Sequence, residues 1–114
     1  MTTLYGIKNC DTVKKARKWL EANNIAYQFH DFRADGLSAD KVEDWISKCD
    51  FSVLVNKRGT TYRQLTDEVK ATLAPDNATQ MLVESPTLLK RPILELGTDV
   101  VIGFKEQDYQ QRFK

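Results

Sequence analysis

The amino-acid sequence predicts an α/β fold in which a four-stranded mixed sheet is interrupted by a block of helices. Residues 2–7 and 25–32 have the pattern of strands and flank an amphipathic helix over 11–23, which is the size and order of a βαβ unit with parallel strands. Much later, residues 92–96 and 100–104 predict an antiparallel hairpin, because a tight turn separates two apolar runs. A last helix follows this hairpin.

The first helix is predicted from its apolar spacing. Between Asp11 and about Asn23, the residues that share one helical face are Val13, Ala16, Trp19 and Leu20. Asn23 and Asn24 then end the helix. The strand that follows places three apolar side chains on one face: Ile25, Tyr27 and Phe29.

The middle of the chain predicts several short helices. We expect helices over residues 38–48, 51–55, 66–75 and 77–84, a polar turn over 56–62, and a short turn begun by Ser85 and Pro86. Ser38 and Thr66 are the capping residues of the first and third of these helices. Each helix is too short to stand alone, so we interpret residues 37–90 as a helical insertion within a single domain of residues 1–114.

The C-terminal segment completes the arrangement. Gly97, Thr98 and Asp99 form the tight turn of the hairpin. Tyr109 and Phe113 are four residues apart and place one face of the closing helix on the sheet. The order strand–helix–strand, helices, strand–strand–helix is that of a thioredoxin-like fold with an insertion in its middle.

Composition and charge argue against several classes of protein. The chain has 17 Lys and Arg against 16 Asp and Glu, and a formal net charge of +1 gives no bulk attraction to nucleic acid or to a membrane surface. No apolar run is long enough to span a bilayer, and the N-terminus lacks the pattern of a signal peptide. We therefore expect a cytoplasmic monomer that makes no direct contact with nucleic acid or membrane.

The cysteine and histidine counts argue against a disulfide framework and a metal site. Two cysteines, Cys10 and Cys49, fit a reducing compartment. Cys49 follows a helical pattern and is expected to be a structural or half-exposed thiol at a helix end. A zinc site needs clustered ligands, which His30 and two distant cysteines do not provide.

Cys10 is the candidate nucleophile, because it stands where a short strand has ended and a helix begins. A sulfur in the first turn of a helix meets unpaired backbone N–H groups and the positive end of the helix dipole, and both favour the reactive thiolate. Asp11 opposes this effect, whereas four nearby basic residues support it: Lys8, Lys14, Lys15 and Arg17. The alternative is an inert cysteine that only packs.

The residues around Cys10 distinguish among cysteine chemistries. A Cys-x-x-Cys dithiol needs a second sulfur at position 13, which is Val13. A phosphatase loop needs an arginine six residues after the cysteine, where Ala16 stands and Arg17 is one position too late. His30 shows no sign of serving as a general base for the thiol. What remains is a single nucleophilic cysteine that requires a second thiol from another molecule.

Two further segments carry candidate binding residues. Arg91 precedes Pro92 at the start of a predicted strand, and its planar guanidinium suits a carboxylate or an oxyanion. The turn over residues 56–63 carries Lys57, Arg58 and Arg63. The alternatives are a solvated surface arginine and a plain solvated loop.

These motifs together resemble the arsenate reductase (ArsC) family, and especially its YffB branch, which is related to the Spx transcription regulators. The similarity lies in residues 4–16 (LYGIKNCDTVKKA), 56–63 (NKRGTTYR), 89–92 (LKRP) and 103–104 (GF), in order and across nearly the whole chain. The resemblance implies a thioredoxin-like sheet with a helical insertion, Cys10 as the nucleophile, and a cis peptide bond before Pro92.

The sequence also departs from the family pattern. Glutaredoxin-coupled arsenate reductases hold the oxyanion with three arginines, of which Arg91 matches the one before the cis proline. Asn56 stands where the second is expected, with Arg58 two residues later, and the third falls near Gly103 and is missing. These differences argue against arsenate reduction. Val13 likewise breaks the Cys-x-x-Cys that is typical of Spx regulators.

The resemblance implies a glutathione-dependent thiol reductase, an oxidoreductase without a permanently bound cofactor. Cys10 would attack an oxidised small molecule or protein thiol, and glutathione, as co-substrate, would resolve the adduct. The residues implied to bind substrate or glutathione are Lys8, Asn9, Arg58, Arg91 and Pro92. The alternative is a protein-binding regulator of Spx type that docks on RNA polymerase, in which the thiol is incidental.

Overall fold

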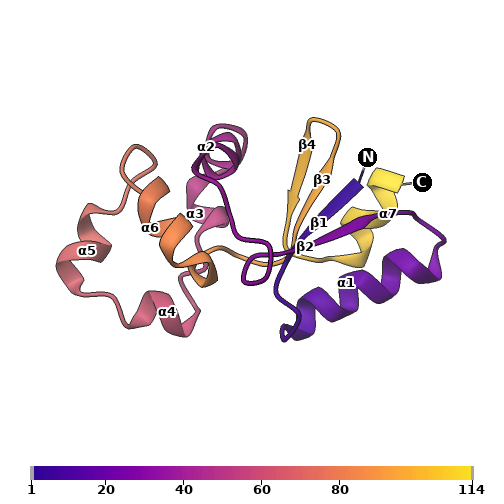
Figure 1. Cartoon of the computed structure of the whole chain (residues 1–114), viewed down its shortest axis with the longest axis horizontal. Coiled ribbons are helices and arrows are strands. Elements are labelled where there is room, and N and C mark those ends of the chain that lie inside the picture. The colour runs from indigo at the N-terminus through magenta and orange to yellow at the C-terminus, as the bar shows by residue number, and fades with distance from the viewer. Residues whose placement is uncertain (1, 114) are drawn as a thin grey trace. The chain divides into compact units, whose positions relative to one another are not determined.

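A computed structural model describes residues 2–113 of the chain, which form four strands and eight helical segments (Figure 1). In chain order these are β1 (Thr2–Gly6), α1 (Asp11–Ala22), β2 (Gln28–Asp31), α2 (Ala39–Lys48), α3 (Phe51–Leu54), α4 (Thr60–Arg63), α5 (Asp67–Thr72), α6 (Thr79–Glu84), the 3₁₀ turn η1 (Pro86–Leu88), β3 (Ile93–Leu96), β4 (Asp99–Ile102) and α7 (Glu106–Phe113). No helix within residues 2–113 is long and apolar enough to cross a membrane.

The strands form one mixed sheet in the order β2-β1-β3-β4. β1 pairs with β2 in parallel and with β3 in antiparallel orientation, and β3 pairs with β4 in antiparallel orientation. The register places Leu4 beside both Phe29 and Leu94, and Leu94 beside Val101, so these side chains share one face. The predicted four-stranded mixed sheet and its βαβ unit are confirmed.

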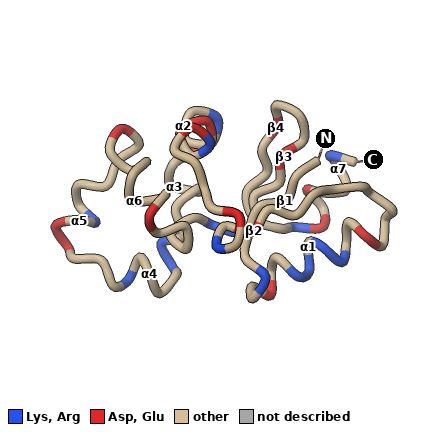
Figure 2. Tube along the Cα trace, in the orientation of Figure 1, with Lys and Arg blue, Asp and Glu red and all other residues tan. Residues whose placement is uncertain are grey.

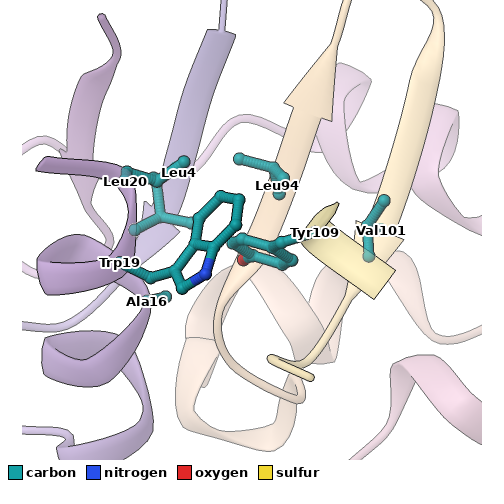
Figure 3. Packing of buried hydrophobic residues seen from close by; sticks show 7 residues of the cluster. All are labelled: Leu4, Ala16, Trp19, Leu20, Leu94, Val101 and Tyr109. Carbon is teal, nitrogen blue, oxygen red and sulfur yellow. The ribbon is translucent and has the colours of Figure 1, made fainter. Parts of the chain in front are cut away.

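Helices α1 and α7 cover this apolar face of the sheet. Figure 3 shows the ring of Trp19 beside that of Tyr109, between α1 and the strands. The two rings meet edge to face, with centroids 5.6 Å apart at 84°. Phe104 also packs edge to face on Tyr109, with ring centroids 4.7 Å apart at 89°. This aromatic packing fixes α1 on the sheet, and the predicted apolar faces of both helices are confirmed.

The residue contacts divide the chain into two units. One is Gly36–Lys90, and the other is made by the segments on either side of it, which contain the sheet, α1 and α7. Within Gly36–Lys90, Ser38 and Thr66 cap α2 and α5 as expected, each accepting a hydrogen bond from a backbone N–H three residues later at 3.2 Å. Trp45 and Leu82 are fully buried in this unit. The proposal that both units belong to one domain stays a prediction.

Several predicted boundaries were wrong. The strand expected from residue 25 begins at Gln28, because the backbone N–H of Ile25 is used to close the end of α1 on Leu20 O at 3.0 Å. The polar turn over 56–62 contains the start of α4 at Thr60. The helices expected over 66–75 and 77–84 are shorter, and Ser85 occupies the cap position of η1 without a side-chain capping bond.

Burial of the Tyr109 hydroxyl lowers the stability of the folded protein. Tyr109 is fully buried, and among the described residues its hydroxyl has no hydrogen-bond partner. Burial raises the pKa of Tyr109, because the phenolate would lose its water. The ring therefore stabilises the core while its oxygen opposes that stabilisation.

We predict that Tyr109→Phe raises the free energy of unfolding by about 1 kcal/mol, because it removes a buried polar atom that lacks a partner. Tyr27→Phe is the matched control, since the Tyr27 hydroxyl donates to Glu21 at 2.8 Å and accepts from Arg17 at 3.2 Å. The control should be neutral or lose stability. Urea unfolding of both variants measures the difference, and a Tyr109→Phe protein less stable than Tyr27→Phe would contradict this reading.

Candidate active site

Cys10 occupies the N-cap position of α1, as the sequence predicts. Its backbone is extended, at φ −121° and ψ 122°, and its carbonyl accepts the first helical hydrogen bond from Lys14 N at 3.0 Å. The side chain makes no capping hydrogen bond, and the residue is half-buried and not in a disulfide. The thiol therefore lies at the start of the helix without being used to satisfy the helix end. Basic residues recur along the helix that follows (Figure 2).

A close approach between β1 and α1 sets the position of this helix start. A Cβ atom at Gly6 would lie 2.7 Å from Cγ2 of Val13, so the strand end and the first turn of α1 meet only because Gly6 has no side chain. Val13 is fully buried. The position that would hold the second sulfur of a dithiol is thus filled by a core residue.

Asp31 is a residue of the site that the sequence did not single out. It ends β2, in register with Gly6, and is only 7% exposed. Its carboxylate accepts hydrogen bonds from the backbone N–H groups of Arg33 at 2.8 Å and Ala34 at 3.3 Å, and from that of Lys8. The bonds to Arg33 and Ala34 form an Asx turn, a local structure that aspartate favours, whereas the contact with Lys8 is not visible in the local sequence pattern.

Opposing effects act on the pKa of Asp31. Burial raises the pKa, but the hydrogen bonds from Arg33, Ala34 and Lys8, together with the charge of Lys8, outweigh burial and hold it below its usual range. The carboxylate therefore stays ionised and ties the end of β2 to Lys8, two residues before Cys10. Asp31 is a positioning residue for the loop that carries the thiol.

We predict that Asp31→Asn lowers the free energy of unfolding at pH 7 by about 1–3 kcal/mol, because buried N–H groups lose a charged acceptor. Since folding lowers the pKa of Asp31, its stabilisation is complete above the unfolded pKa and is lost as the pH falls through the folded pKa. The difference between wild type and variant should therefore shrink below about pH 4. Denaturant unfolding at pH 7 and pH 3 measures this.

Asp76→Asn is the control for this experiment, because Asp76 is exposed on the loop between α5 and α6. This control should leave the free energy of unfolding at pH 7 unchanged. A wild-type advantage over Asp31→Asn that is as large at pH 3 as at pH 7 would show that the Asp31 charge does not hold the loop.

The Arg91–Pro92 peptide bond is cis, as the family resemblance implied. Pro92 is buried directly before β3, and the register of β3 on β1, continued by one residue, places it opposite Gly6. The Pro92 carbonyl accepts a hydrogen bond from Gly103 N at 2.8 Å. Pro92 and Arg91 therefore lie at the same end of the sheet as the loop that follows β1.

Asn56 and Gly103 stand at or near the positions where the family resemblance implies the second and third arginines of an oxyanion clamp. Gly103 has φ 81°, a left-handed conformation that favours glycine, and its N–H is bound to Pro92. An arginine would be strained there. The Asn56 side chain stabilises the turn that it begins, because its oxygen accepts a hydrogen bond from Arg58 N at 3.3 Å.

The strand topology brings most of the predicted site residues to one end of the sheet. Lys8 and Asn9 are exposed in the loop between β1 and Cys10, and Arg91 is half-buried before Pro92. The end of β2, which carries Asp31, joins them because β2 is parallel to β1. Arg58 lies instead in the Gly36–Lys90 unit.

The other candidate groups, Cys49 and His30, make contacts within the fold. Cys49 ends α2, with its N–H bound to Trp45 O at 2.9 Å, as expected of a thiol at a helix end. Burial, and then the charge of Asp44, raise the pKa of Cys49 against the opposing charge of Lys48. The ring of His30 packs on Tyr5 at 4.9 Å. Among residues 2–113, no three His, Cys, Asp or Glu side chains are grouped to hold a metal ion.

The sheet, its covering helices and a cysteine at the start of the first helix define a thioredoxin-like α/β protein. The ArsC family model matches residues 5–112, and the chain belongs to the ArsC family. A Haemophilus influenzae protein without an assigned activity is 49% identical over 99% of both chains. The transcriptional regulator Spx 2 of Lactococcus lactis is 26% identical, over 95% of this chain and 83% of its own length.

Solved structures agree with this membership. The structure of a YffB protein matches with a TM-score of 0.93 and 40% identity, over 97% of each chain. The structure of an arsenate reductase related protein from Brucella melitensis matches with a TM-score of 0.79 and 40% identity, over 99% of this chain and 94% of the other. The relatives thus include both reductase-named and regulator-named proteins.

Proposed function

We propose that this protein is a glutathione-dependent thiol reductase whose single nucleophile is Cys10. The observation that carries the proposal is the half-buried thiol at the start of α1, which makes no capping bond. Helix starts favour thiolate, the form that attacks disulfides. The proposal includes a cytoplasmic monomer without a resident cofactor.

The reaction needs a thiol from outside the chain. The Cys10 thiolate attacks the glutathione sulfur of a mixed disulfide, the S–S bond breaks, and the substrate leaves as a thiolate that takes up a proton. A glutathione thiolate then attacks the new Cys10–glutathione disulfide, which releases the Cys10 thiolate and oxidised glutathione. One mixed disulfide and one glutathione thus yield one substrate thiol and one oxidised glutathione. Val13 stands where an internal resolving cysteine would be.

We assign glutathione binding to polar side chains and to the backbone beside Pro92. Lys8, Asn9 and Arg91 would hold its carboxylates, and Pro92, directly before β3, would present backbone to the extended peptide. Asp31 would act through Lys8, because it binds the backbone of that residue. Arg58 belongs to the same proposal through the family resemblance alone.

We predict that the wild-type protein reduces a glutathionylated peptide in an assay coupled to glutathione reductase, and that Cys10→Ser falls to the uncatalysed rate, because the serine hydroxyl cannot form the mixed disulfide. Cys49→Ser is the matched control and should keep its activity. A Cys10→Ser protein as active as wild type would overturn the proposal. A wild-type rate equal to the uncatalysed exchange would overturn it too.

Arsenate reduction has less support than thiol reduction. Among the solved relatives is one named as an arsenate reductase related protein. Asn56 and Gly103 nevertheless stand where the second and third arginines of the oxyanion clamp are expected, and Gly103 has a conformation that disfavours any side chain. We expect the rate with arsenate to be far below the rate with a glutathionylated peptide in the same coupled assay.

A protein-binding regulator that docks on RNA polymerase is the second candidate. It is favoured by relatives named as Spx regulators, such as the one that is 26% identical over 95% of this chain. Purified RNA polymerase, titrated with fluorescently labelled protein, tests it directly. Saturable binding that Cys10→Ser retains, together with no reductase activity, would favour the regulator over the enzyme.

A further inference from the structure

The Gly36–Lys90 unit contains a basic pocket. The pocket has a volume of about 440 Å³, and its walls carry Lys57, Arg58 and Lys90 together with Val53, Val55 and Asn56. In Figure 2 the trace between α3 and α4 carries the blue of Lys57 and Arg58. A volume of this size is typical of sites for small organic ligands.

The two walls of this basic pocket are held together by backbone contacts. Val55 and Leu89 form an isolated antiparallel bridge. On either side of the bridge, Asn56 N donates to Leu88 O at 2.7 Å and Lys90 N donates to Leu54 O at 2.8 Å. Because Lys57 and Arg58 follow one side of the bridge and Lys90 follows the other, their backbone positions are fixed before any ligand binds.

The turn that presents Lys57 and Arg58 is also locked. The side-chain oxygen of Asn56 accepts from Arg58 N at 3.3 Å, and the carbonyl of Asn56 accepts from Gly59 N at 3.2 Å. Asn56 therefore orders the turn, which leaves the cationic side chains exposed at its tip.

The charges around the pocket leave an excess of positive charge. Asp50 is a carboxylate near these cations, and its pKa is lowered mainly by hydrogen bonds from Ser52, with a contribution from the charge of Lys57. Lys57, Arg58 and Lys90 carry three positive charges and Asp50 offsets one of them at most, so at least two remain for a ligand. A dianion matches this charge.

The volume and the lining of the pocket indicate which kind of dianion would fit it. A single tetrahedral oxyanion would leave most of the 440 Å³ unfilled. Val53 is 43% exposed and lines the pocket, whereas Val55 is only 3% exposed, so Val53 supplies most of the apolar surface beside the cationic groups. We propose that this basic pocket binds a small organic dicarboxylate whose two carboxylates are separated by an apolar segment. The site does not depend on the reductase proposal, because Cys10 is not part of it and the two proposals share only Arg58.

Pimelate is a suitable probe, because an apolar chain separates its two carboxylates. Titration of the ¹⁵N-labelled protein with pimelate should give saturable amide shifts over residues 52–58 and at Lys90. Heptanoate, which keeps the chain but has one carboxylate, should bind at least about tenfold more weakly, since it loses a charge-assisted pair. Phosphate should also bind more weakly than pimelate, and added salt should weaken all three interactions.

Two substitutions locate the binding site. Arg58→Gln and Lys90→Gln should each weaken pimelate binding by about tenfold, because each removes a charged partner from a different wall. Lys48→Gln is the matched control, since Lys48 belongs to the same unit but pairs with Asp44 on α2. Unchanged amide spectra away from the pocket would show that the variants are folded.

Several results would overturn the proposal. They are the absence of saturable shifts with pimelate, shifts confined to residues outside the pocket, equal affinity for phosphate or heptanoate, and wild-type affinity in both Arg58→Gln and Lys90→Gln. None of these results bears on Cys10, so failure of this site is distinguishable from failure of the reductase.

Discussion

The packing of α1 on the sheet is the constraint on which the rest of the site depends. Trp19 lies against Tyr109, and Gly6 admits Val13 at a distance that a side chain would forbid. Together these contacts fix where α1 begins and how closely its first turn approaches β1. Cys10 is the residue at that start. The position of the thiol is therefore a consequence of core packing, with no help from a capping bond of its own.

The ends of three strands surround the loop that carries this thiol. Asp31 ends β2 and binds the backbone of Lys8, while Pro92 precedes β3 and is bound by Gly103 through its carbonyl. Since β1 is parallel to β2 and antiparallel to β3, these residues meet at one end of the sheet. Backbone hydrogen bonds thus position the loop, whereas the side chains assigned to ligands stay exposed or half-buried. Such a site suits a substrate that brings its own reactive sulfur.

The sequence predicted the fold well wherever apolar spacing reports burial. The face of α1, the βαβ unit and the C-terminal hairpin all follow from residues such as Trp19 and Leu94, which pack in the core. The single turn of α4 escaped prediction because it buries no residue and has no apolar period. Asp31 escaped for another reason. Its role depends on the distant Lys8 backbone, and local pattern gives no information on such a contact.

Mass spectrometry of the intact protein after exposure to oxidised glutathione tests the central claim most directly. The location of Cys10 at the start of α1 predicts one glutathione per chain, attached at Cys10 and removed by reduced glutathione. Cys49 should react more slowly, because burial and Asp44 raise the pKa of its thiol. An unmodified Cys10, or glutathione found on Cys49 alone, would contradict the claim that the fold makes Cys10 the reactive thiol.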